Sequence, residues 1–338
     1  MQMRLIAAAV ALVASGLGAA RGEDLKLAIV APVADSAFFG AVNAGCVARA
    51  TTLARDGDTL GCLFAGPGFV LPQPDAAAPA AAADATAPAA PPRDPRTQAA
   101  IVRDFIAAHV DGIALSPMDD PTVVAAIDAA VHAGIPVLTF DADAPTSSRT
   151  AFVGTNARDF GRALGASLKR WKPKGGKFAI LSTDPKQPNI AERIIGIRDA
   201  IGPGWKEIAD SPVITSGDFS DAVARVDKLL GQYFDVDAII SVGAWPMLAT
   251  DEWRTMIDKY KPRIDKADVV LVVADALPAQ RNLVREGLGH VLVGQRPADM
   301  GARIAEMIMD LKHGRKVPEV VYTGFDTLTR LDLAAPAK

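Results

Sequence analysis

The stretch from Val110 to Asp143 constrains the fold of this chain more than any other. Two short apolar runs, Gly112–Leu115 and Ile135–Phe140, flank a segment whose apolar residues recur at helical spacing. Near-continuous apolar runs are typical of parallel strands that are covered on both faces, because a strand with one solvated face alternates instead. The stretch is therefore predicted to form a βαβ unit of an open α/β sheet.

The helix of this unit has well-marked ends. Asp119 or Asp120 can cap its start, Pro121 fits its first turn, and Gly134 can end it. Short apolar runs and helical segments then alternate along most of the 338 residues. Alternation over this length indicates two parallel sheets rather than one, and a chain with 50% hydrophobic residues can bury two cores. We expect an α/β fold with two doubly wound, Rossmann-like lobes.

The N-terminus has the pattern of a secretory signal peptide. Residues 1–20 combine one basic residue, Arg4, a short apolar run and small residues up to Ala20, where cleavage is expected. The run is too short for a membrane-spanning helix, and no cysteine near the cleavage site offers a lipid attachment point. The mature chain would hold 35 basic and 39 acidic residues, a net charge of −4 that does not indicate nucleic acid as a partner. We expect a protein exported to the periplasm without a lipid anchor.

The two cysteines are expected to pair. Cys46 falls on the apolar stripe of the predicted helix Phe39–Arg55, and Cys62 alternates with Leu60 and Phe64 on the next predicted strand. Both side chains can therefore point into one helix-sheet layer, and disulfides persist in oxidising compartments. We predict a disulfide between Cys46 and Cys62.

Residues 72–96 interrupt the alternation. Eighteen of these 25 residues are Ala or Pro, and so many prolines prevent a regular helix or strand. The segment is predicted to be a flexible surface insertion.

Motifs for several other functions are absent from the sequence. It has no GxGxxG after the first strand, no GxxxxGK[ST], no HExxH or HxxxH spacing among its four histidines, and no GxSxG. No cofactor or metal site is therefore indicated. An exported α/β enzyme stays an alternative without visible catalytic machinery.

Polar and aromatic side chains gather where the predicted strands end. Ligands of open α/β sheets bind outside the carboxyl ends of the strands. Carboxylates and amides accept hydrogen bonds from hydroxyls, arginine donates in a fork, and aromatic rings cover the apolar face of a sugar ring. This chemistry predicts a small sugar or polyol as the ligand. The candidate site residues are Asp35, Ser36, Phe38, Phe39, Asp141, Asp143, Asn189, Arg193, Trp245, Asp275 and Gln295.

Several candidates also have a purely structural explanation. One phenylalanine of the 38–39 pair could fasten its helix to the core. Asp143 and Asp275 could cap helices, Arg193 could lie on a solvated helix face, and Trp245 could belong to a packed turn. These alternatives stay open at the level of the sequence.

A set of motifs in this order resembles a known family. The segments are VDGIALSP, GIPVLTFD, ERIIGIRDAI, VVADALP and VGQRPADMG. Together they are similar to the sugar-binding, ribose-binding-like group of type I periplasmic solute-binding proteins, which serve ABC transporters. The resemblance runs from about Leu25 to Leu331, apart from residues 72–96.

The resemblance implies two lobes joined by three crossings, with the ligand enclosed when the hinge closes. The crossings would lie near Val153–Asn156, Gly294–Pro297 and Tyr322–Phe325. The implied N-terminal lobe comprises residues 25–154 and 296–323, and the C-terminal lobe comprises residues 155–295 and 324–338.

The family's ligand-binding residues match this sequence only in part. The matching positions are Phe38, Phe39, Asp141, Arg193, Asp275 and Gln295. Three family positions differ: an Asn is Ser36, an Arg is Ala142, and an Asn-Asp pair is Gly243-Ala244, with Trp245 close behind. These departures imply a sugar-binding branch that differs from the ribose-binding members.

The resemblance implies a monomeric periplasmic protein that captures a small sugar or polyol and delivers it to an ABC transporter permease. It implies neither catalysis nor a cofactor. Repressors that share the two-lobe core carry an N-terminal helix-turn-helix, whereas this chain has an export signal there. The main alternative is a periplasmic sensor subunit that presents the bound ligand to a chemoreceptor or sensor kinase.

Overall fold

The fold was derived from a computed structural model. It describes residues 24–33, 36–54, 58–67, 97–118 and 120–334. The predicted signal peptide, Asp35 and the Ala/Pro-rich segment lie outside the described residues. Within the described residues, none of the helices combines the length and hydrophobicity that a membrane crossing would need.

The predicted βαβ unit is present. It consists of β3 (Gly112–Leu115), α3 (Pro121–His132) and β4 (Val137–Phe140). The Asp120 side chain caps α3 by accepting a hydrogen bond of 2.8 Å from the amide of Thr122. All eight residues of the two strands are buried, as expected for strands with helices on both faces.

The first sheet has six strands in the described part of the chain, in the order β12-β5-β4-β3-β1-β2, and all are parallel. Its remaining strands are β1 (Asp24–Val30), β2 (Thr59–Ala65), β5 (Ala151–Gly154) and β12 (Val320–Tyr322). α2 (Gln98–Ala107) and α3 pack on one face, and α1 (Ala37–Leu53) and α9 (Pro297–Lys312) pack on the other. We call this sheet and its helices the first lobe.

The second sheet has seven strands among the described residues, and its main order is β13-β11-β10-β9-β6-β7. They are β6 (Gly176–Ser182), β7 (Trp205–Glu207), β8 (Val213–Ile214), β9 (Ala238–Ser241), β10 (Val270–Ala274), β11 (Val291–Gln295) and β13 (Phe325–Thr329). Only β13 is antiparallel to its neighbour. The helical elements are α4 (Ala157–Trp171), α5 (Pro188–Ile201), α6 (Phe219–Gln232), the 3₁₀ turn Trp245–Met247, α7 (Thr250–Asp265), α8 (Pro278–Arg285) and α10 (Arg330–Ala334). This sheet and its helices form the second lobe.

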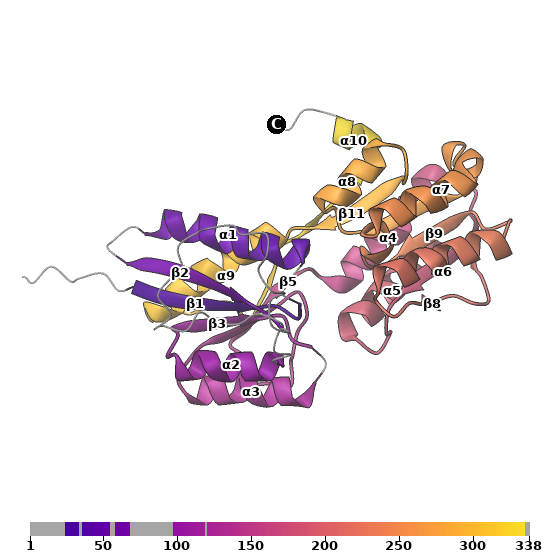
Figure 1. Ribbon diagram of the computed structural model, residues 1–338. Helices are drawn as coiled ribbons and strands as arrows, with labels where there is room; N and C mark the ends of the chain where they lie inside the picture. Colours follow the sequence, from indigo (N-terminus) through magenta and orange to yellow (C-terminus); the bar gives the residue numbers. More distant parts are fainter. Residues whose placement is uncertain (1–23, 34–35, 55–57, 68–96, 119, 335–338) are drawn as a thin grey trace, which may run out of the picture.

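The chain passes between the two lobes three times (Figure 1). It crosses after β5, crosses back between β11 and α9, and crosses again between β12 and β13. The predicted fold class, two doubly wound lobes with three crossings, is confirmed.

Some predicted elements differ from the observed ones. The sequence predicts one strand at Ser211–Thr215, but the structure has the two-residue β8 there and a second edge strand, β7, that was not predicted. β7 has only three residues between turns, too few for a recognisable pattern. The predicted final strand, Leu328–Leu331, is instead the end of β13 followed by α10.

Each lobe contains one pair of helices in backbone contact. A Cβ built on Gly45 of α1 would overlap the carbonyl oxygen of Ala298 in α9. In the second lobe, a Cβ on Gly161 of α4 would overlap the carbonyl oxygen of Arg193 in α5. Only glycine permits these approaches. The second contact fixes the position of the helix that carries Arg193.

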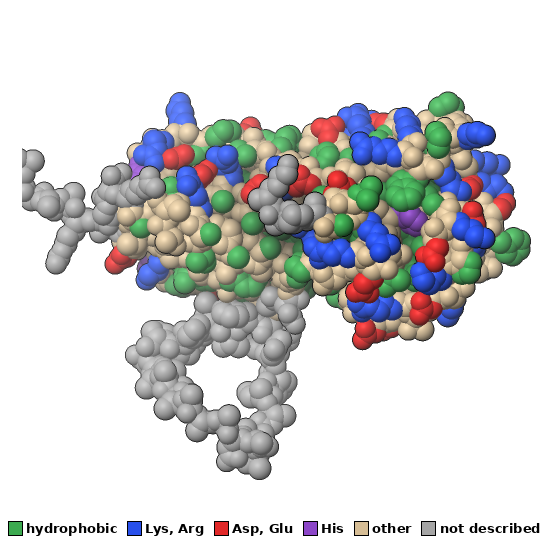
Figure 2. Space-filling view, turned by 90° about the horizontal axis from the view of Figure 1, so that it is seen from above, with side chains coloured by type: hydrophobic (Ala, Val, Ile, Leu, Met, Phe, Trp, Pro, Cys, Tyr) green, Lys and Arg blue, Asp and Glu red, His purple; other side chains and the backbone are tan. Residues whose placement is uncertain are grey.

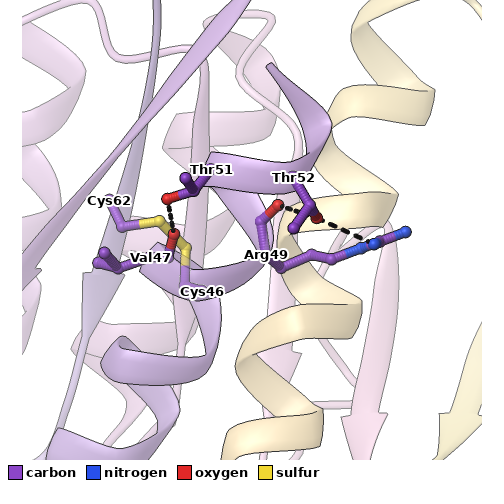
Figure 3. Close-up of a disulfide and its surroundings, with 6 residues drawn as sticks. All are labelled: Cys46, Val47, Arg49, Thr51, Thr52 and Cys62. Atoms are coloured by element: carbon purple, nitrogen blue, oxygen red, sulfur yellow. Dashed lines mark hydrogen bonds between the residues drawn. A yellow bond between two sulfur atoms is a disulfide. The ribbon is translucent and has the colours of Figure 1, made fainter. Parts of the chain in front are cut away.

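The predicted disulfide between Cys46 and Cys62 is present, with a Cα–Cα distance of 6.3 Å (Figure 3). It joins α1 to β2, and Cys46 is fully buried in the core of the first lobe. Thr51 bonds the carbonyl of Val47 beside it. The bond therefore ties one covering helix to the edge strand of its sheet.

Reducing this disulfide is expected to lower the free energy of unfolding by about 3 kcal/mol. The two cysteines are 16 residues apart, and opening a loop of this size raises the entropy of the unfolded chain by roughly that amount. Urea denaturation with and without reductant measures the difference. A Cys46→Ala/Cys62→Ala double variant should unfold like the reduced protein in either buffer; coinciding curves for oxidised and reduced wild type would contradict the expectation.

Candidate functional site

Asp141 and Asp275 occupy equivalent positions in the two lobes. Each follows a central strand, β4 or β10, and each has a left-handed backbone, with φ of 59° and 69°. The amide of Asp141 donates to the carbonyl of Val153 at 3.1 Å, and that of Asp275 donates to Val293 at 2.7 Å. Non-glycine residues in this conformation are uncommon and concentrate at functional sites. Both carboxylates emerge at the carboxyl ends of their sheets, between the lobes.

Arg193 comes from α5 of the second lobe. It is only 5% exposed, so it does not lie on a solvated helix face. Its Nη1 donates to the carbonyl of Val242 at 2.8 Å, and its Cζ lies 4.8 Å from the ring centroid of Phe160. The ring and the carbonyl hold the guanidinium in place while leaving most of its donors available.

Arg193 makes no direct ion pair with Asp141 or Asp275; no nitrogen–oxygen distance of 4.0 Å or less joins these described side chains. Its charge nevertheless acts on both carboxyl groups. The guanidinium thus influences both carboxyl groups electrostatically without contacting them directly.

Gln295 connects this cluster to the second crossing. Its Nε2 donates to Oδ1 of Asp275 at 3.0 Å, whereas its Oε1 is buried without a partner. Of the four other buried side-chain atoms without a hydrogen-bond partner in the described residues, two are Nε of Arg193 and Oγ1 of Thr155 in the first crossing, and two, in Asn43 and Arg49, belong to α1. Buried polar groups are nearly always hydrogen-bonded, and leaving one unpaired costs about 1–3 kcal/mol. The unpartnered atoms of Arg193 and Gln295, together with the carboxyl groups of Asp141 and Asp275, indicate a ligand site, which we call the hollow.

Burial strongly affects both carboxyl groups. Desolvation raises the pKa of Asp141 to about 6, against the opposing effect of Arg193; Asp275 raises it further, and Gln295 and Ser116 lower it. Desolvation also raises the pKa of Asp275, again opposed by Arg193 and by Gln295. Asp141 nevertheless keeps some accessible surface.

Phe38 and Phe39 have different surroundings. The Phe39 ring lies 6.1 Å from the ring of Phe140 on β4, edge to face, so it fastens α1 to the sheet. The Phe38 ring lines a groove of about 730 Å³ that also reaches Asp275 and Gln295. Of the two residues, Phe38 is placed to contact a ligand.

This groove runs along the junction of the lobes. One wall comes from the starts of α1 and α9, and the other from α8 with Arg281 and Asn282. Seen from this side, charged side chains of both signs gather around the junction, while the first lobe presents a mostly uncharged surface (Figure 2). Ala244 and Leu277 of the second lobe share a buried apolar cluster with Phe38 and Phe39 of the first, so the lobes are in contact.

Asp143 belongs to a separate network. Its carboxylate accepts bonds from Nε and Nη2 of Arg149 at 2.5 and 2.7 Å, from the hydroxyl of Thr139 at 2.5 Å and from the amide of Ala144 at 2.8 Å. These bonds occupy both oxygens and brace the loop after β4. Asp143 thereby supports the loop that presents Asp141, and the structure does not bring its carboxylate into the cluster.

The other candidates lie at the margins of the cluster. Ser36 is the N-cap residue of α1, and its hydroxyl makes no capping bond. Asn189 lies in the first turn of α5, where its Oδ1 accepts from the amide of Ile190 at 3.0 Å. Trp245 is partly buried, and its ring folds over Gly243. Thus Trp245 is in a packed turn, as one alternative held, although part of its ring stays accessible.

Four polar residues near the site were not among the sequence candidates. Thr155 and Ser116 border the hollow, the first through its unpartnered hydroxyl and the second beside Asp141. Gln280 and Gln98 are buried and shape the loops: Gln280 bonds the carbonyl of Ala274 and the amide of Leu277, around Asp275. Gln98 bonds Ser116 and Met118 in the same way. Only Ser116, which directly follows a strand, carried a visible sequence signal.

Acidification is expected to favour contact between the lobes in the ligand-free protein. The pKa of Asp141 is raised from 3.8 to about 6 in the contacting form, so the proton is bound more tightly there than when Asp141 faces water. The resulting stabilisation is complete below pH 4 and is lost as the pH rises through 6, a change on the order of 3 kcal/mol. Small-angle X-ray scattering at pH 4.5 and 7.5 measures it as a smaller radius of gyration at pH 4.5.

Asp141→Asn serves as the control for this effect, because its amide does not titrate and most of the dependence should vanish. A radius of gyration that stays constant in the wild type, or that shrinks as the pH rises, would contradict the assignment.

Comparison with known proteins agrees with this geometry. A protein-family model described as a periplasmic binding protein domain matches residues 27–316. The ribose import binding protein RbsB of Bacillus subtilis (strain 168) is 24% identical over 234 residues, which cover 68% of this chain and 72% of that protein. The Salmonella typhimurium protein of the same name is 23% identical over 225 residues, covering 66% and 73%.

Solved structures share the fold. GanP, a glucose-galactose binding protein from Geobacillus stearothermophilus, has a TM-score of 0.72 at 24% identity, with 93% of this chain and all of that chain covered. An ABC transporter solute-binding protein from Burkholderia graminis C4D1M, in complex with D-arabinose, has a TM-score of 0.75 at 23% identity, with 94% and 99% covered.

Proposed function

The chain belongs to the family of periplasmic binding protein domains, and from this premise we propose that it captures a small sugar or polyol between its lobes and delivers it to the permease of an ABC transporter. In this proposal the protein is monomeric, is exported by residues 1–20, and works in the periplasm. The similar proteins are solute-binding proteins, and no catalytic step is part of the proposal.

One observation carries the proposal. Buried polar groups from both lobes lie together with hydrogen-bonding capacity left over: Asp141 from the first lobe, and Asp275, Arg193 and Gln295 from the second. Nε of Arg193 and Oε1 of Gln295 have no partner in the described residues. A ligand rich in hydroxyl groups would satisfy them, because each hydroxyl both donates to a carboxylate and accepts from a guanidinium. Phe38, and the accessible part of Trp245, would cover the apolar face of the ligand.

The three crossings would link binding to closure. When the lobes separate, Asp141 moves away from Arg193 and Asp275, and the hollow opens to water. A ligand that bonds groups of both lobes stabilises the closed form by its differential affinity for that form. The permease would then recognise the closed, loaded protein.

A thermal-shift screen of the mature protein tests the proposal. It should include pentoses, hexoses, polyols, amino acids and organic acids. At a hundredfold excess over Kd, a true ligand adds about 2.7 kcal/mol to the free energy of unfolding, which raises Tm measurably. A stereospecific shift with one sugar or polyol is expected. A shift with amino acids or organic acids alone would overturn the ligand class.

Two further measurements complete the test. Asp141→Ala should abolish the shift while the circular dichroism spectrum stays that of the wild type, because the variant removes one partner of a buried hydrogen bond. Deletion of the gene should abolish uptake of the labelled ligand by cells. Normal uptake together with a lost transcriptional or chemotactic response would favour the sensor alternative over delivery.

A further inference from the structure

The charges in the hollow do not balance. Two carboxyl groups, Asp141 and Asp275, are both acted on by Arg193. The three arginines that line the groove beside Asp275 are engaged elsewhere: Arg296 pairs with Asp326, and Arg281 and Arg285 bond backbone carbonyls. Arg193 already uses part of its capacity, because Nη1 bonds the carbonyl of Val242 and the guanidinium lies against the ring of Phe160. With both carboxyl groups ionised, the hollow carries one uncompensated negative charge in a poorly solvated place, which is energetically costly.

The hydrogen-bonding groups are also unbalanced, because acceptors outnumber donors. Asp141 and Asp275 together offer four carboxylate oxygens; Gln295 donates to Oδ1 of Asp275, and Gln295 and Ser116 also hydrogen-bond the carboxyl group of Asp141. Oε1 of Gln295 is a further buried acceptor without a partner. The buried donors without a partner in the described cluster are Nε of Arg193 and the hydroxyl of Thr155, and the hydroxyl can also accept. The hollow therefore offers more acceptors than donors.

We propose that the preferred ligand carries one protonated amine, so that it is an amino sugar or an amino polyol. This inference rests on the proposed function and names the chemical class within it. An ammonium group has three donors, no acceptor and one positive charge. It supplies the positive charge and the hydrogen-bond donors that the hollow lacks.

The placement of the ligand follows from the same groups. Its ammonium lies among the oxygens of Asp141, Asp275 and Gln295, and a hydroxyl or the ring oxygen accepts from Nε of Arg193. A neutral sugar can fill the same space, but it leaves the extra negative charge uncompensated unless a proton binds with it. An acidic sugar adds a second like charge and is excluded.

Isothermal titration calorimetry at pH 6.5, where these amines are protonated, tests the inference. Each amine is compared with its parent: D-glucosamine with D-glucose, D-galactosamine with D-galactose, and 1-amino-1-deoxysorbitol with sorbitol. N-acetyl-D-glucosamine and D-glucuronate test the neutral amide and the acid. For the matching stereochemistry, the amine is expected to bind about tenfold more tightly than its parent, and the acid is not expected to bind.

Asp141→Asn removes the excess charge with little change of shape. The variant is expected to lose the preference for the amine, and its affinities for amine and parent should become equal. A second measurement uses the wild type alone: titrations in two buffers of different ionisation enthalpy count the protons taken up. Binding of a neutral sugar should take up a proton, whereas binding of the amine should not.

The outcomes separate the two proposals. If neutral parents bind the wild type at least as tightly as the amines, without proton uptake, the charge inference is overturned and sugar binding stands. If neither sugars nor amines of any stereochemistry bind, the proposed function is overturned as well.

Discussion

Arg193→Ala is expected to weaken ligand binding at least a hundredfold and to lower the free energy of unfolding by about 3 kcal/mol at neutral pH. The guanidinium is the one cation that opposes the burial of Asp141 and Asp275. Removing one member of a buried charged cluster leaves the others uncompensated, at a typical cost of 3–5 kcal/mol. A hundredfold loss of affinity corresponds to about 2.7 kcal/mol, within the range for a buried charged contact.

Arg198→Ala is the matched control, because Arg198 lies on the same helix and bonds Glu207 at the protein surface, with a side chain that is 46% exposed. It should change stability by less than about 1 kcal/mol and leave affinity unchanged. Arg193→Lys keeps the positive charge but loses the forked donor geometry of the guanidinium. Its affinity and stability should fall between those of the wild type and of Arg193→Ala. Calorimetry and urea denaturation measure both effects. Arg193→Ala with wild-type affinity would remove Arg193 from the site.

Gly45→Ala is expected to destabilise the protein by about 3 kcal/mol, although it adds a single methyl group to a helix. The added Cβ would overlap the carbonyl oxygen of Ala298, a backbone atom that cannot move unless α9 moves. Forcing a packed pair of helices apart typically costs 1–3 kcal/mol and occasionally more. Because α9 starts at Pro297, immediately after the second crossing, its displacement should also disturb Gln295 and weaken ligand binding.

Gly40→Ala provides the control within the same helix. Gly40 is exposed, and nothing lies within 4 Å of a Cβ built there. Alanine has the higher helix propensity, so this variant should gain up to about 1 kcal/mol. Thermal and urea unfolding of the two variants should therefore move in opposite directions. Equal changes in stability for the two variants would show that the contact between α1 and α9 is not what makes Gly45→Ala destabilising.

The sequence was most informative where geometry follows from topology. Asp141, Asp275 and Gln295 were predicted because they follow the carboxyl ends of apolar runs, and parallel strands deliver such residues to one edge. Arg193 was a candidate because it lies near a predicted helix start, and it also matches a family position; its burial against Phe160 required the structure. The element boundaries were close where the end signals are strong, as in α3, which begins at Pro121 as predicted and ends two residues before Gly134.

The sequence was least informative where a partner decides the role of a residue. Asp143 and Asp141 have the same local pattern, but the carboxylate of Asp143 pairs with Arg149, six residues later. Phe38 and Phe39 are adjacent and identical, and only the position of Phe140 assigns one of them to the core. Thr155 became a candidate because its hydroxyl lacks a partner, which is a property of the folded molecule alone.

The threefold passage of the chain between the lobes also sets an order of assembly. The core of the first lobe includes Met300, Ile304 and Ile308 of α9, and its sheet is completed by β12. These segments are synthesised after residues 155–295, which supply six of the seven described strands of the second sheet. The first lobe thus begins first but is completed only after most of the second lobe has been made, and only β13 and α10 of the second lobe follow β12. As the chain emerges, the second lobe can collapse while the first still waits for its last helix and strand, and the disulfide between α1 and β2 can hold the early part together in the meantime.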